Sequence, residues 1–409
     1  MRLWLLLACS IAALPAADDQ RFTLSLQAQS RFERVERSPA PDLGDTIACT
    51  QAQAALFPVA LPEELALIHY RKGVCTLAGA GITRSAAEFA DAAAEFDKAV
   101  EAWLARSRAP GKKAPPEPLP SGLRVLAAIA RLETGAHPTL SLDPPGCSSS
   151  LMSPGFCTAL TETARQWLGW LALDRNDLDG AARDFSGSAG TGWAEWVAGR
   201  QAFQAGQYQE AARQFRQAVD LARQGPSASP LGRVSPRPDV ASELIELGGA
   251  QLLAGDGRAA IASLDEAVKA APQSARALFL RARARETAGQ GEAALADYNL
   301  ASRTAFANAA NLESGEAHLY RGILLYRRKD FTHAENEFAS ALNFEIPGGL
   351  RADAVAWRHL AAVASGSCDA SREYLERSLD AASPYFPKAE ARRLMGACPT
   401  SASLSARGL

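Results

Sequence analysis

The sequence predicts an all-α fold, a solenoid of stacked antiparallel helical hairpins. One spacing of small and bulky residues recurs five times along the chain, which is the signature of a repeat architecture. Short turns such as 205–207 and 255–257 separate the two helices that each copy implies. Of the 409 residues, 47% are hydrophobic, which is ample for a packed core and makes overall disorder unexpected.

The recurring unit contains a Gly or Ala, an Ala 12 positions later, a bulky residue after a further 4 positions and a small residue after a further 3. The third and fourth copies begin 34 residues apart, and the other intervals are 30, 49 and 40 residues, as expected when the connections differ in length. The five copies are Gly169, Ala181, Phe185 and Ser188; Gly199, Ala211, Phe215 and Ala218; Gly248, Ala260, Leu264 and Ala267; Ala282, Ala294, Tyr298 and Ala301; and Gly322, Ala334, Phe338 and Ala341.

This spacing has a packing reason. Two antiparallel helices approach closely only where one of them presents a very small side chain, so the first helix should receive the bulky residue of the second at its Gly. The second copy would place Phe215 against Gly199, while Ala211 and Ala218 leave room for the next hairpin. A single hairpin cannot bury this face alone, whereas a stack of hairpins can.

The hairpins resemble tetratricopeptide repeats, whose 34-residue unit carries small residues and an aromatic residue in this order. The resemblance is clear from Glu162 to Leu342, and Pro272 ends a second helix as the family pattern expects. It implies a right-handed solenoid whose concave surface binds peptides or folded proteins.

Some positions depart from the repeat pattern. Arg281 and Arg285 occupy places on a first helix that are usually apolar in the family. Two flanking stretches look like degenerate copies: 354–379 keeps Tyr374 but lacks the Gly. The other has about seven extra residues in its turn and contains Gly73, Ala92, Phe96 and Ala99.

The chain divides into segments by composition and pattern. Two Pro-rich stretches around 106–122 and 224–239 should be exposed loops or hinges. Phe22–Ala28 alternates and could be a short strand or part of a flexible arm. Helices are expected at 61–78, 85–105 and 121–134. The predicted division is 1–17 signal peptide, 18–44 N-terminal arm, 45–106 degenerate hairpin, 107–120 linker, 121–223 helical segment and repeats, 224–239 linker, 240–348 repeats, 349–398 degenerate capping helices and 399–409 flexible tail.

The first residues have the features of a cleavable secretory signal. Arg2 is a minimal basic region, Trp4–Leu14 is an apolar core, and small residues near Ala16 precede Asp18. An apolar run of this length is too short to cross a bilayer of about 30 Å, although a buried first helix or an uncleaved anchor stays open. The stretch ending at Cys9 also resembles a lipobox, which would make Cys9 a lipid-modified first residue. We therefore expect export to the periplasm or beyond.

The cysteines fit an exported protein. Seven are present, and six remain if Cys9 leaves with the signal. Local pairing closes the smallest loops and suits an array whose distant parts do not touch, although buried reduced thiols are the alternative. The expected pairs are Cys49 with Cys75, Cys147 with Cys157, and Cys368 with Cys398.

Charge and motifs exclude several function classes. The net charge is −2 with 43 basic and 45 acidic residues, which disfavours partners recognised by bulk charge, nucleic acid among them. The sequence has no zinc spacing of Cys and His, no P-loop, no dinucleotide-binding glycine cluster and no GxSxG. Paired carboxylates such as Glu63 and Glu64 are best interpreted as solvated helix surface. No catalytic residue, metal or cofactor is therefore predicted.

Candidate ligand-binding residues follow from the helical phase. Trp196, Arg200 and Phe203 share one face of the first helix of the second copy, opposite Gly199. Trp and Arg dominate binding energies at interfaces. Aromatic residues at helical spacing are more often contacts between neighbouring hairpins, and both interpretations stay open. Trp193 lies at the start of the same face. The corresponding phase on the first helices of other hairpins gives Trp170, Arg276, Phe279, Arg283 and Tyr326.

We expect a non-enzymatic scaffold that binds a protein or peptide in this concave groove within the cell envelope. One alternative is an exported carbohydrate- or nutrient-binding helical-repeat protein, because exposed tryptophans stack on sugars. Another is a hydrolase whose active site carries no recognisable motif. The oligomeric state and the identity of the partner are not predicted.

Overall fold

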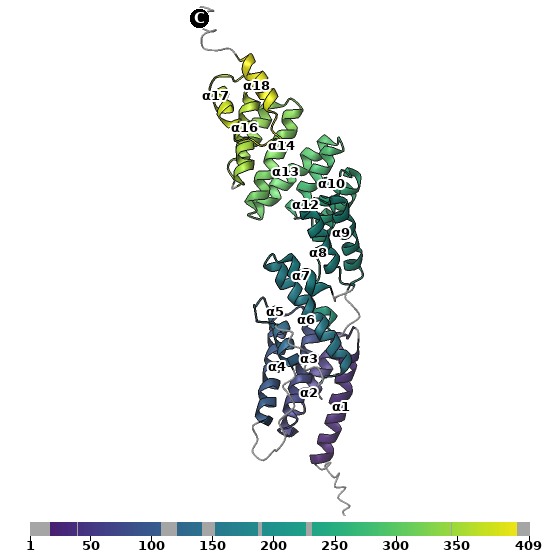
Figure 1. The fold of residues 1–409 in the computed structure, drawn as a ribbon. Coiled ribbons are helices and arrows are strands. Elements are labelled where there is room, and N and C mark those ends of the chain that lie inside the picture. The colour runs from purple at the N-terminus through teal and green to yellow at the C-terminus, as the bar shows by residue number, and fades with distance from the viewer. Residues whose placement is uncertain are drawn as a thin grey trace, which may run out of the picture. The chain divides into compact units, whose positions relative to one another are not determined.

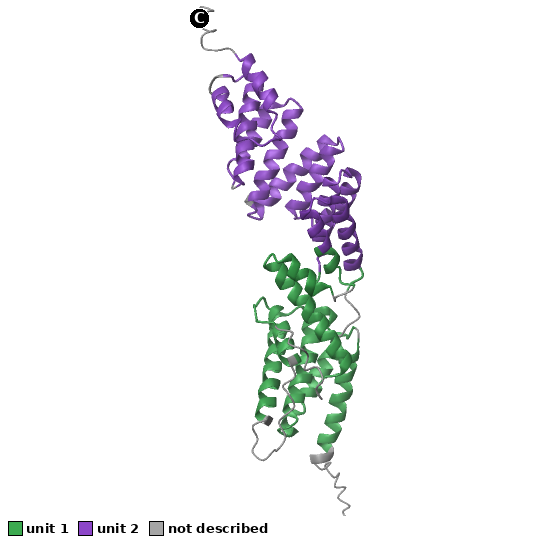
Figure 2. Cartoon of the chain, viewed as in Figure 1, with its two compact units in different colours: residues 1–197, 224–237 green, residues 198–223, 238–409 purple. Residues whose placement is uncertain are grey.

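The computed structural model describes residues 17–38, 40–107, 121–140, 152–186, 190–225, 231–344 and 346–398. Within these ranges it contains eighteen α-helices and two 3-10 helices, and no strand (Figure 1). Successive helices pack as antiparallel hairpins, which confirms the predicted all-α solenoid of stacked hairpins. The chain forms two compact units: unit 1 comprises residues 1–197 and 224–237, and unit 2 comprises residues 198–223 and 238–409 (Figure 2).

Unit 1 is built from the N-terminal helices. α3 packs against α2 and α4, and α4 packs in turn against α5. Its core joins residues from α1 to α6 with two residues of the later 224–237 segment. The elements are α1 (Ala17–Arg37), α2 (Leu43–Ala54), η1 (Phe57–Val59), α3 (Leu65–Thr83), α4 (Ala86–Ser107), α5 (Ser121–Leu132), α6 (Pro154–Asp174), α7 (Leu178–Phe185), η2 (Gly232–Val234) and the first residues of α8 (Trp193–Gln204).

Unit 2 continues the repeat. Each helix from α9 to α17 packs against the next one, and α10, α12, α14 and α16 also pack against one another in that order. The helices are the rest of α8, α9 (Tyr208–Arg223), α10 (Val240–Leu253), α11 (Gly257–Ala270), α12 (Ala275–Thr287), α13 (Gly291–Ala307), α14 (Asn311–Arg327), α15 (Phe331–Ala341), α16 (Gly348–Ala364), α17 (Asp369–Ser378) and α18 (Lys388–Ala397).

The small residue of each first helix receives the bulky residue of the second, as the spacing predicts. A Cβ atom added at Gly199 would lie 2.7 Å from the Phe215 ring, and one added at Gly248 would lie 2.4 Å from Leu264 Cγ. Both distances are shorter than real Cβ contacts, so these positions admit no side chain. The same relationship joins Gly73 to Phe96, Gly169 to Phe185 and Gly322 to Phe338.

Two arginines at usually apolar positions of α12 have buried partners. Arg281 Nε and Nη2 donate to the two carboxylate oxygens of Asp297 on α13, both at 2.8 Å. Arg285 Nη1 donates to Asp297 Oδ2 at 2.8 Å, and both arginines also reach Asp265 on α11. Because Asp297 is buried, this bidentate network replaces the apolar contacts that the repeat pattern leads one to expect.

The N-terminal stretch is helical, so neither the strand nor the flexible arm that the sequence left open for Phe22–Ala28 is found. The whole stretch lies in α1, within the predicted 18–44 arm. Phe22 and Leu26 are 65% and 53% exposed, whereas Ala28 and Phe32 are buried against unit 1. The alternation is a coincidence of composition, because burial follows the helical spacing from Ala28 to Phe32.

The second Pro-rich stretch is not an exposed loop over its described residues. Leu231 and Val234 are buried in the core of unit 1, and Pro236 and Pro238 are also buried. The prediction of exposure for 224–239 is therefore wrong at these four residues, whereas Arg233 and Arg237 are exposed. The prediction failed because this segment contacts tryptophans that lie far away in the sequence, and composition does not reveal such contacts. In the first Pro-rich stretch, residues 108–120 lie outside the described residues, between the end of α4 and the start of α5.

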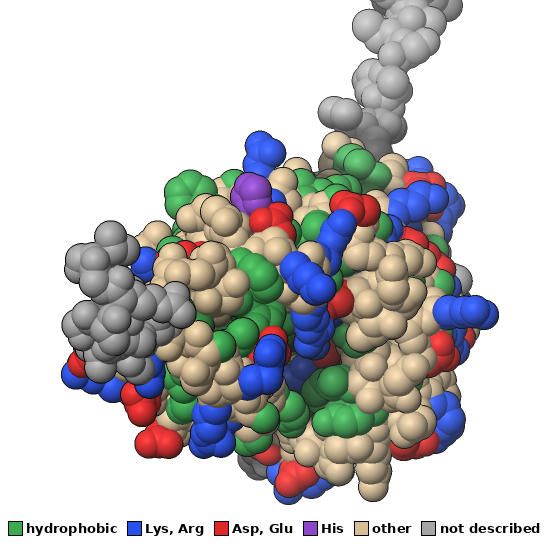
Figure 3. All heavy atoms as spheres, turned by 90° about the horizontal axis from the view of Figure 1, so that it is seen from above, with side chains coloured by type: hydrophobic (Ala, Val, Ile, Leu, Met, Phe, Trp, Pro, Cys, Tyr) green, Lys and Arg blue, Asp and Glu red, His purple; other side chains and the backbone are tan. Residues whose placement is uncertain are grey.

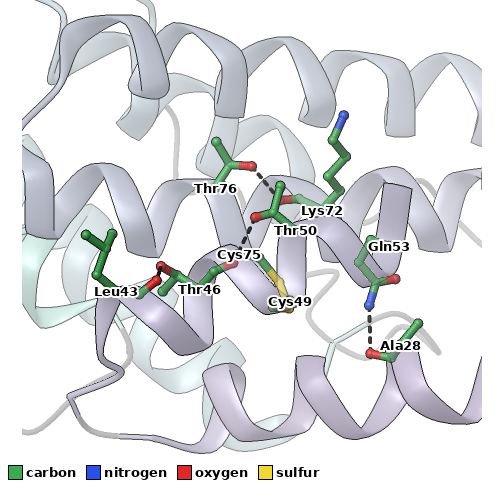
Figure 4. Close-up of a disulfide and its surroundings, with 9 residues drawn as sticks. All are labelled: Ala28, Leu43, Thr46, Cys49, Thr50, Gln53, Lys72, Cys75 and Thr76. Atoms are coloured by element: carbon green, nitrogen blue, oxygen red, sulfur yellow. Dashed lines mark hydrogen bonds between the residues drawn. A yellow bond between two sulfur atoms is a disulfide. The ribbon is translucent and has the colours of Figure 1, made fainter. Parts of the chain in front are cut away.

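Two of the three expected cysteine pairs are bonded in the structure. Cys49 of α2 is joined to Cys75 of α3, with their Cα atoms 5.9 Å apart (Figure 4). Cys368 is joined to Cys398, with their Cα atoms 5.6 Å apart. Around the first bond, Gln53 Nε2 donates to the Ala28 carbonyl at 2.7 Å, which ties α2 to α1. Cys147, the expected partner of Cys157, lies outside the described residues, as does Ser188 of the first repeat copy.

Candidate binding groove

Two adjoining cavities of unit 2 are lined mainly by the first helices of its hairpins, which we call the inner helices. The first has a volume of about 440 Å³ and the second about 790 Å³. They share Leu253, Arg283 and Tyr320, so they form one continuous surface that we call the unit 2 groove. Its walls come from the C-terminal part of α8, from α10, α12, α14 and α16, and from the connection before α18.

The repeat spacing explains why these side chains face the groove. On α8, α10 and α14, the glycine that packs against the second helix of the hairpin leaves the opposite face of the first helix free of intrahairpin contacts. Successive first helices lie side by side, so their free faces join into one surface. Figure 3 shows Lys and Arg side chains beside apolar ones on the face seen from above.

The first cavity combines arginines with aromatic rings. Arg200 Nη1 lies 2.9 Å from Glu246 Oε1, and Arg276 Nη1 lies 3.4 Å from Glu316 Oε2. Burial raises the pKa of Glu316, although the charge of Arg276 acts in the opposite direction. Arg200 and Arg276 therefore line the cavity with their charges partly compensated by carboxylates, beside Phe203 and other apolar residues.

Arg283 differs from its neighbours because it forms no ion pair with a described residue. Its guanidinium carbon lies 4.0 Å from the centroid of the Tyr320 ring, which is a close cation–π contact. The ring restrains the guanidinium without using up its fork of N–H donors. Arg283 is therefore a cation placed at the junction of the two cavities with donors available to a ligand.

The second cavity is more apolar. Trp357 packs in it edge-on against Phe386, with the ring centroids 5.2 Å apart. Tyr385 lies at its rim and is 95% exposed. Other apolar residues that line this cavity are Leu319, Ile323 and Leu350. The second cavity can accommodate a large apolar side chain of a ligand.

The part of the chain that the structure describes has no cluster of three or more His, Cys, Asp or Glu residues able to hold a metal ion. None of its helices combines the length and apolar character that a membrane crossing requires.

Residues 246–310 match the family model described as tetratricopeptide repeat. This range begins near the middle of α10 and contains α11, α12 and α13, which form the hairpins around the first cavity. Residues 246–310 therefore carry tetratricopeptide repeat sequence. Tetratricopeptide folds are typical of protein–protein interaction scaffolds.

Several solved structures are similar to this chain. MamA 41-end from Desulfovibrio magneticus RS-1 is 19% identical over 45% of this chain and 94% of that chain, with a TM-score of 0.36. YrrB, a TPR protein with an unusual peptide-binding site, is 14% identical over 50% and 91%, with a TM-score of 0.36. PilW, a type IV pilus biogenesis factor, is 17% identical over 57% and 98%, with a TM-score of 0.42. No curated protein matches the sequence significantly.

The unit 2 groove brings together five of the nine residues nominated from the sequence. They line the first cavity, although their contact with a ligand stays a prediction: Arg200, Phe203, Arg276, Phe279 and Arg283.

The other four nominated residues lie elsewhere. Trp193 is buried, stacks on Phe185 with ring centroids 5.4 Å apart, and belongs to unit 1 with Trp170 and Trp196. Tyr326 is also buried; its hydroxyl donates to Glu390 Oε1 at 3.0 Å. Trp193 and Tyr326 therefore have the packing role that the sequence analysis left open.

Sequence reasoning missed several residues of the groove. Leu253 and Tyr320 lie next to Leu252 and Leu319, which also line the groove, so the groove is wider than the single helical phase from which residues were nominated. Glu246 and Glu316 pair with arginines 46 and 40 positions away, and no local pattern reveals such pairs. The loop residue Tyr385 lies outside the repeat and has no repeat position to predict it.

Proposed function

We propose that the unit 2 groove binds an extended segment of a partner protein, and that the chain acts as a scaffold without enzymatic activity. The observation that carries this proposal is the junction at Arg283 and Tyr320, where a cation with available donors separates a basic, aromatic cavity from an apolar one. A surface of this kind selects a ligand by the order of its side chains.

The geometry suits an extended peptide better than a compact small molecule. The two cavities adjoin along the inner helices, so a ligand that fills both must reach across Arg283 and Leu253. An extended chain rises about 3.3 Å per residue and places alternate side chains on one side. A peptide with an acidic residue at Arg283 and a large apolar residue beyond it would satisfy both cavities.

We further propose that the chain acts outside the cytoplasm. The basic, apolar and small residues of 1–17 support an export signal. The bonded pairs Cys49–Cys75 and Cys368–Cys398 agree with it, because disulfides persist in oxidising compartments.

A peptide selection on the full chain tests the groove. Phage-displayed random peptides are selected on the immobilised protein, and an enriched peptide is synthesised and titrated by calorimetry. We expect the enriched peptides to combine an acidic with a large apolar residue, and Arg283→Glu to weaken binding about 10- to 100-fold through repulsion.

Arg303→Glu is the matched control, because Arg303 is an exposed arginine of α13 that does not line the groove. The proposal is wrong if Arg283→Glu binds the peptide as the parent does, or if Arg303→Glu weakens binding equally.

A further inference from the structure

Unit 1 has a cavity of its own, with a volume of about 580 Å³. It lies where residues 231–237, which we call the 231–237 segment, cover α3 and α6. The cavity is separate from the unit 2 groove and shares no residue with it. Its lining comprises Gly81, Arg84, Glu133, Trp167, Trp170 and four residues of the segment.

The 231–237 segment is held in place by specific contacts. Trp167 Nε1 donates to the Val234 carbonyl and Trp193 Nε1 donates to the Pro236 carbonyl, both at 2.9 Å. A Cβ atom at Gly81 would lie 3.0 Å from Val234 Cγ1, so the glycine lets the segment lie close to α3. These contacts give the cavity a defined wall.

Arg84 completes that wall from an unusual backbone position. It is the C-cap residue of α3 with φ of 57°, a left-handed conformation that favours glycine. Its Nη2 lies 2.7 Å from Glu133 Oε2, and its Nη1 donates to the Arg233 carbonyl at 3.1 Å. Arg84 thus neutralises Glu133, the one acidic residue among the described residues of the lining, and fixes the segment as well.

Two positive charges remain without compensation. Arg233 and Arg237 form no ion pair with any residue that the structure describes, and neither does the lining offer a second carboxylate. Arg237 Nη2 donates to the Gly232 carbonyl at 2.6 Å, which leaves its other N–H groups available. Burial, together with the charges of Arg233 and Arg84, lowers the pKa of Arg237. Arg233 and Arg237 line the same cavity and both are exposed, so an anion that enters it can reach two guanidinium groups that no carboxylate compensates.

The cavity also presents an aromatic surface. Trp170 is partly buried and lines the cavity, and its ring meets Trp167 edge-on with the ring centroids 5.6 Å apart. Trp167 holds the Trp170 ring in a fixed orientation, so an apolar ring or the face of a sugar could pack on it.

We propose that this cavity is a binding site for a small anionic ligand, whose phosphate or carboxylate group is held by Arg233 and Arg237 and whose ring lies against Trp170. This site belongs to unit 1 and does not depend on the peptide groove of unit 2. A phosphorylated ligand and a sugar acid share the chemistry that these residues recognise.

Calorimetric titration of the full chain tests the site, with inorganic phosphate, D-glucuronate and neutral D-glucose as probes. We expect saturable binding of one or both anions with one site per chain, weaker binding as salt is added, and no binding of glucose. Trp170→Ala distinguishes the two sources, because it should weaken glucuronate and leave phosphate almost unchanged.

Matched variants decide the role of the arginines. Arg233→Gln combined with Arg237→Gln should lower the affinity at least about tenfold, whereas Arg124→Gln, on an exposed position of α5, should not. Arg237→Lys keeps the charge and should restore most phosphate binding, which separates loss of charge from loss of fold.

The proposal is overturned if neither anion binds saturably, or if the double variant keeps its affinity. Equal loss in Arg124→Gln would overturn it too. Because Arg283→Glu acts on the other unit, it should leave anion binding unchanged whatever it does to peptide binding.

Discussion

The guanidinium carbon of Arg283 lies 4.0 Å from the centroid of the Tyr320 ring, at the boundary between the two cavities of the unit 2 groove. The two residues lie on different hairpins, Arg283 on α12 and Tyr320 on α14. Stacking of successive hairpins therefore creates this cation–π contact, and the repeat unit alone does not contain it.

Removing the Tyr320 ring should leave the Arg283 guanidinium without its cation–π contact and so weaken peptide binding. Tyr320→Leu keeps an apolar side chain but removes the cation–π contact, which contributes about 0.5–2 kcal/mol. We expect the affinity for a peptide selected on the parent protein to fall about threefold to tenfold, measured by calorimetry. Leu300→Ala, at an exposed position of α13 away from the groove, serves as the control and should bind like the parent.

Two adjacent glycines of α10 should respond oppositely to alanine. Gly248→Ala would place a methyl group 2.4 Å from Leu264 Cγ and should destabilise unit 2 by about 1–3 kcal/mol. Gly249→Ala meets only Leu280 Cδ1 at 3.7 Å and should be neutral or more stable by about 0.5 kcal/mol. Urea unfolding measures both, and similar stabilities would contradict the close approach of α10 and α11.

The carboxylate of Asp297 should stabilise unit 2 by compensating the charges of Arg281 and Arg285 on α12. Asp297→Ala leaves Arg281 and Arg285 without their buried partner and should cost about 3 kcal/mol in the free energy of unfolding. Asp265→Ala is the control, since that side chain is 48% exposed and should cost less than about 1 kcal/mol. Equal costs from urea unfolding would show that Asp297 is not the centre of the network.

Unit 1 should lose stability in acid through Glu95. Burial acts to raise the pKa of Glu95, but hydrogen bonds from His69, Lys98 and Lys72 outweigh it and lower the pKa to about 2. Because the folded pKa lies below the unfolded value of about 4.3, this stabilisation is present above that value and is lost as the pH falls toward 2.

Glu95→Gln should therefore lower the free energy of unfolding by about 2 kcal/mol at pH 7 and by much less near pH 2. Thermal unfolding across this range measures the difference between the two proteins. Glu101→Gln, at an exposed position of the same helix, gives the reference. A difference that stays constant with pH would contradict this assignment.

The two bonded cysteine pairs should be found in protein isolated from an oxidising compartment. Peptide mapping by mass spectrometry without reduction should detect Cys49 linked to Cys75 and Cys368 linked to Cys398. Replacing both Cys368 and Cys398 by Ser opens a loop with a sequence separation of 30 and should cost about 3 kcal/mol. Free thiols at these four positions in exported protein would contradict the pairing.

Local patterns predicted the hairpins well because their cause is local. Gly199 meets Phe215 and Gly322 meets Phe338 within one hairpin, so a spacing of 16 residues is visible in the sequence. The 231–237 segment has no such signal. Its composition is that of a loop, and its burial depends on Trp167 and Trp193, which no pattern of spacing connects to it.

The sequence by itself determined the repeat unit, the helices and the packing of small against bulky residues, because each of these follows from side-chain size at helical spacing. Only the tertiary structure decided which faces form cavities and which residues line them. Arg283 meets Tyr320, and the 231–237 segment meets α3 and α6, through contacts between elements that are distant in the chain. Such contacts depend on how hairpins stack and on the length of each connection, and neither is recorded in the pattern of a single repeat.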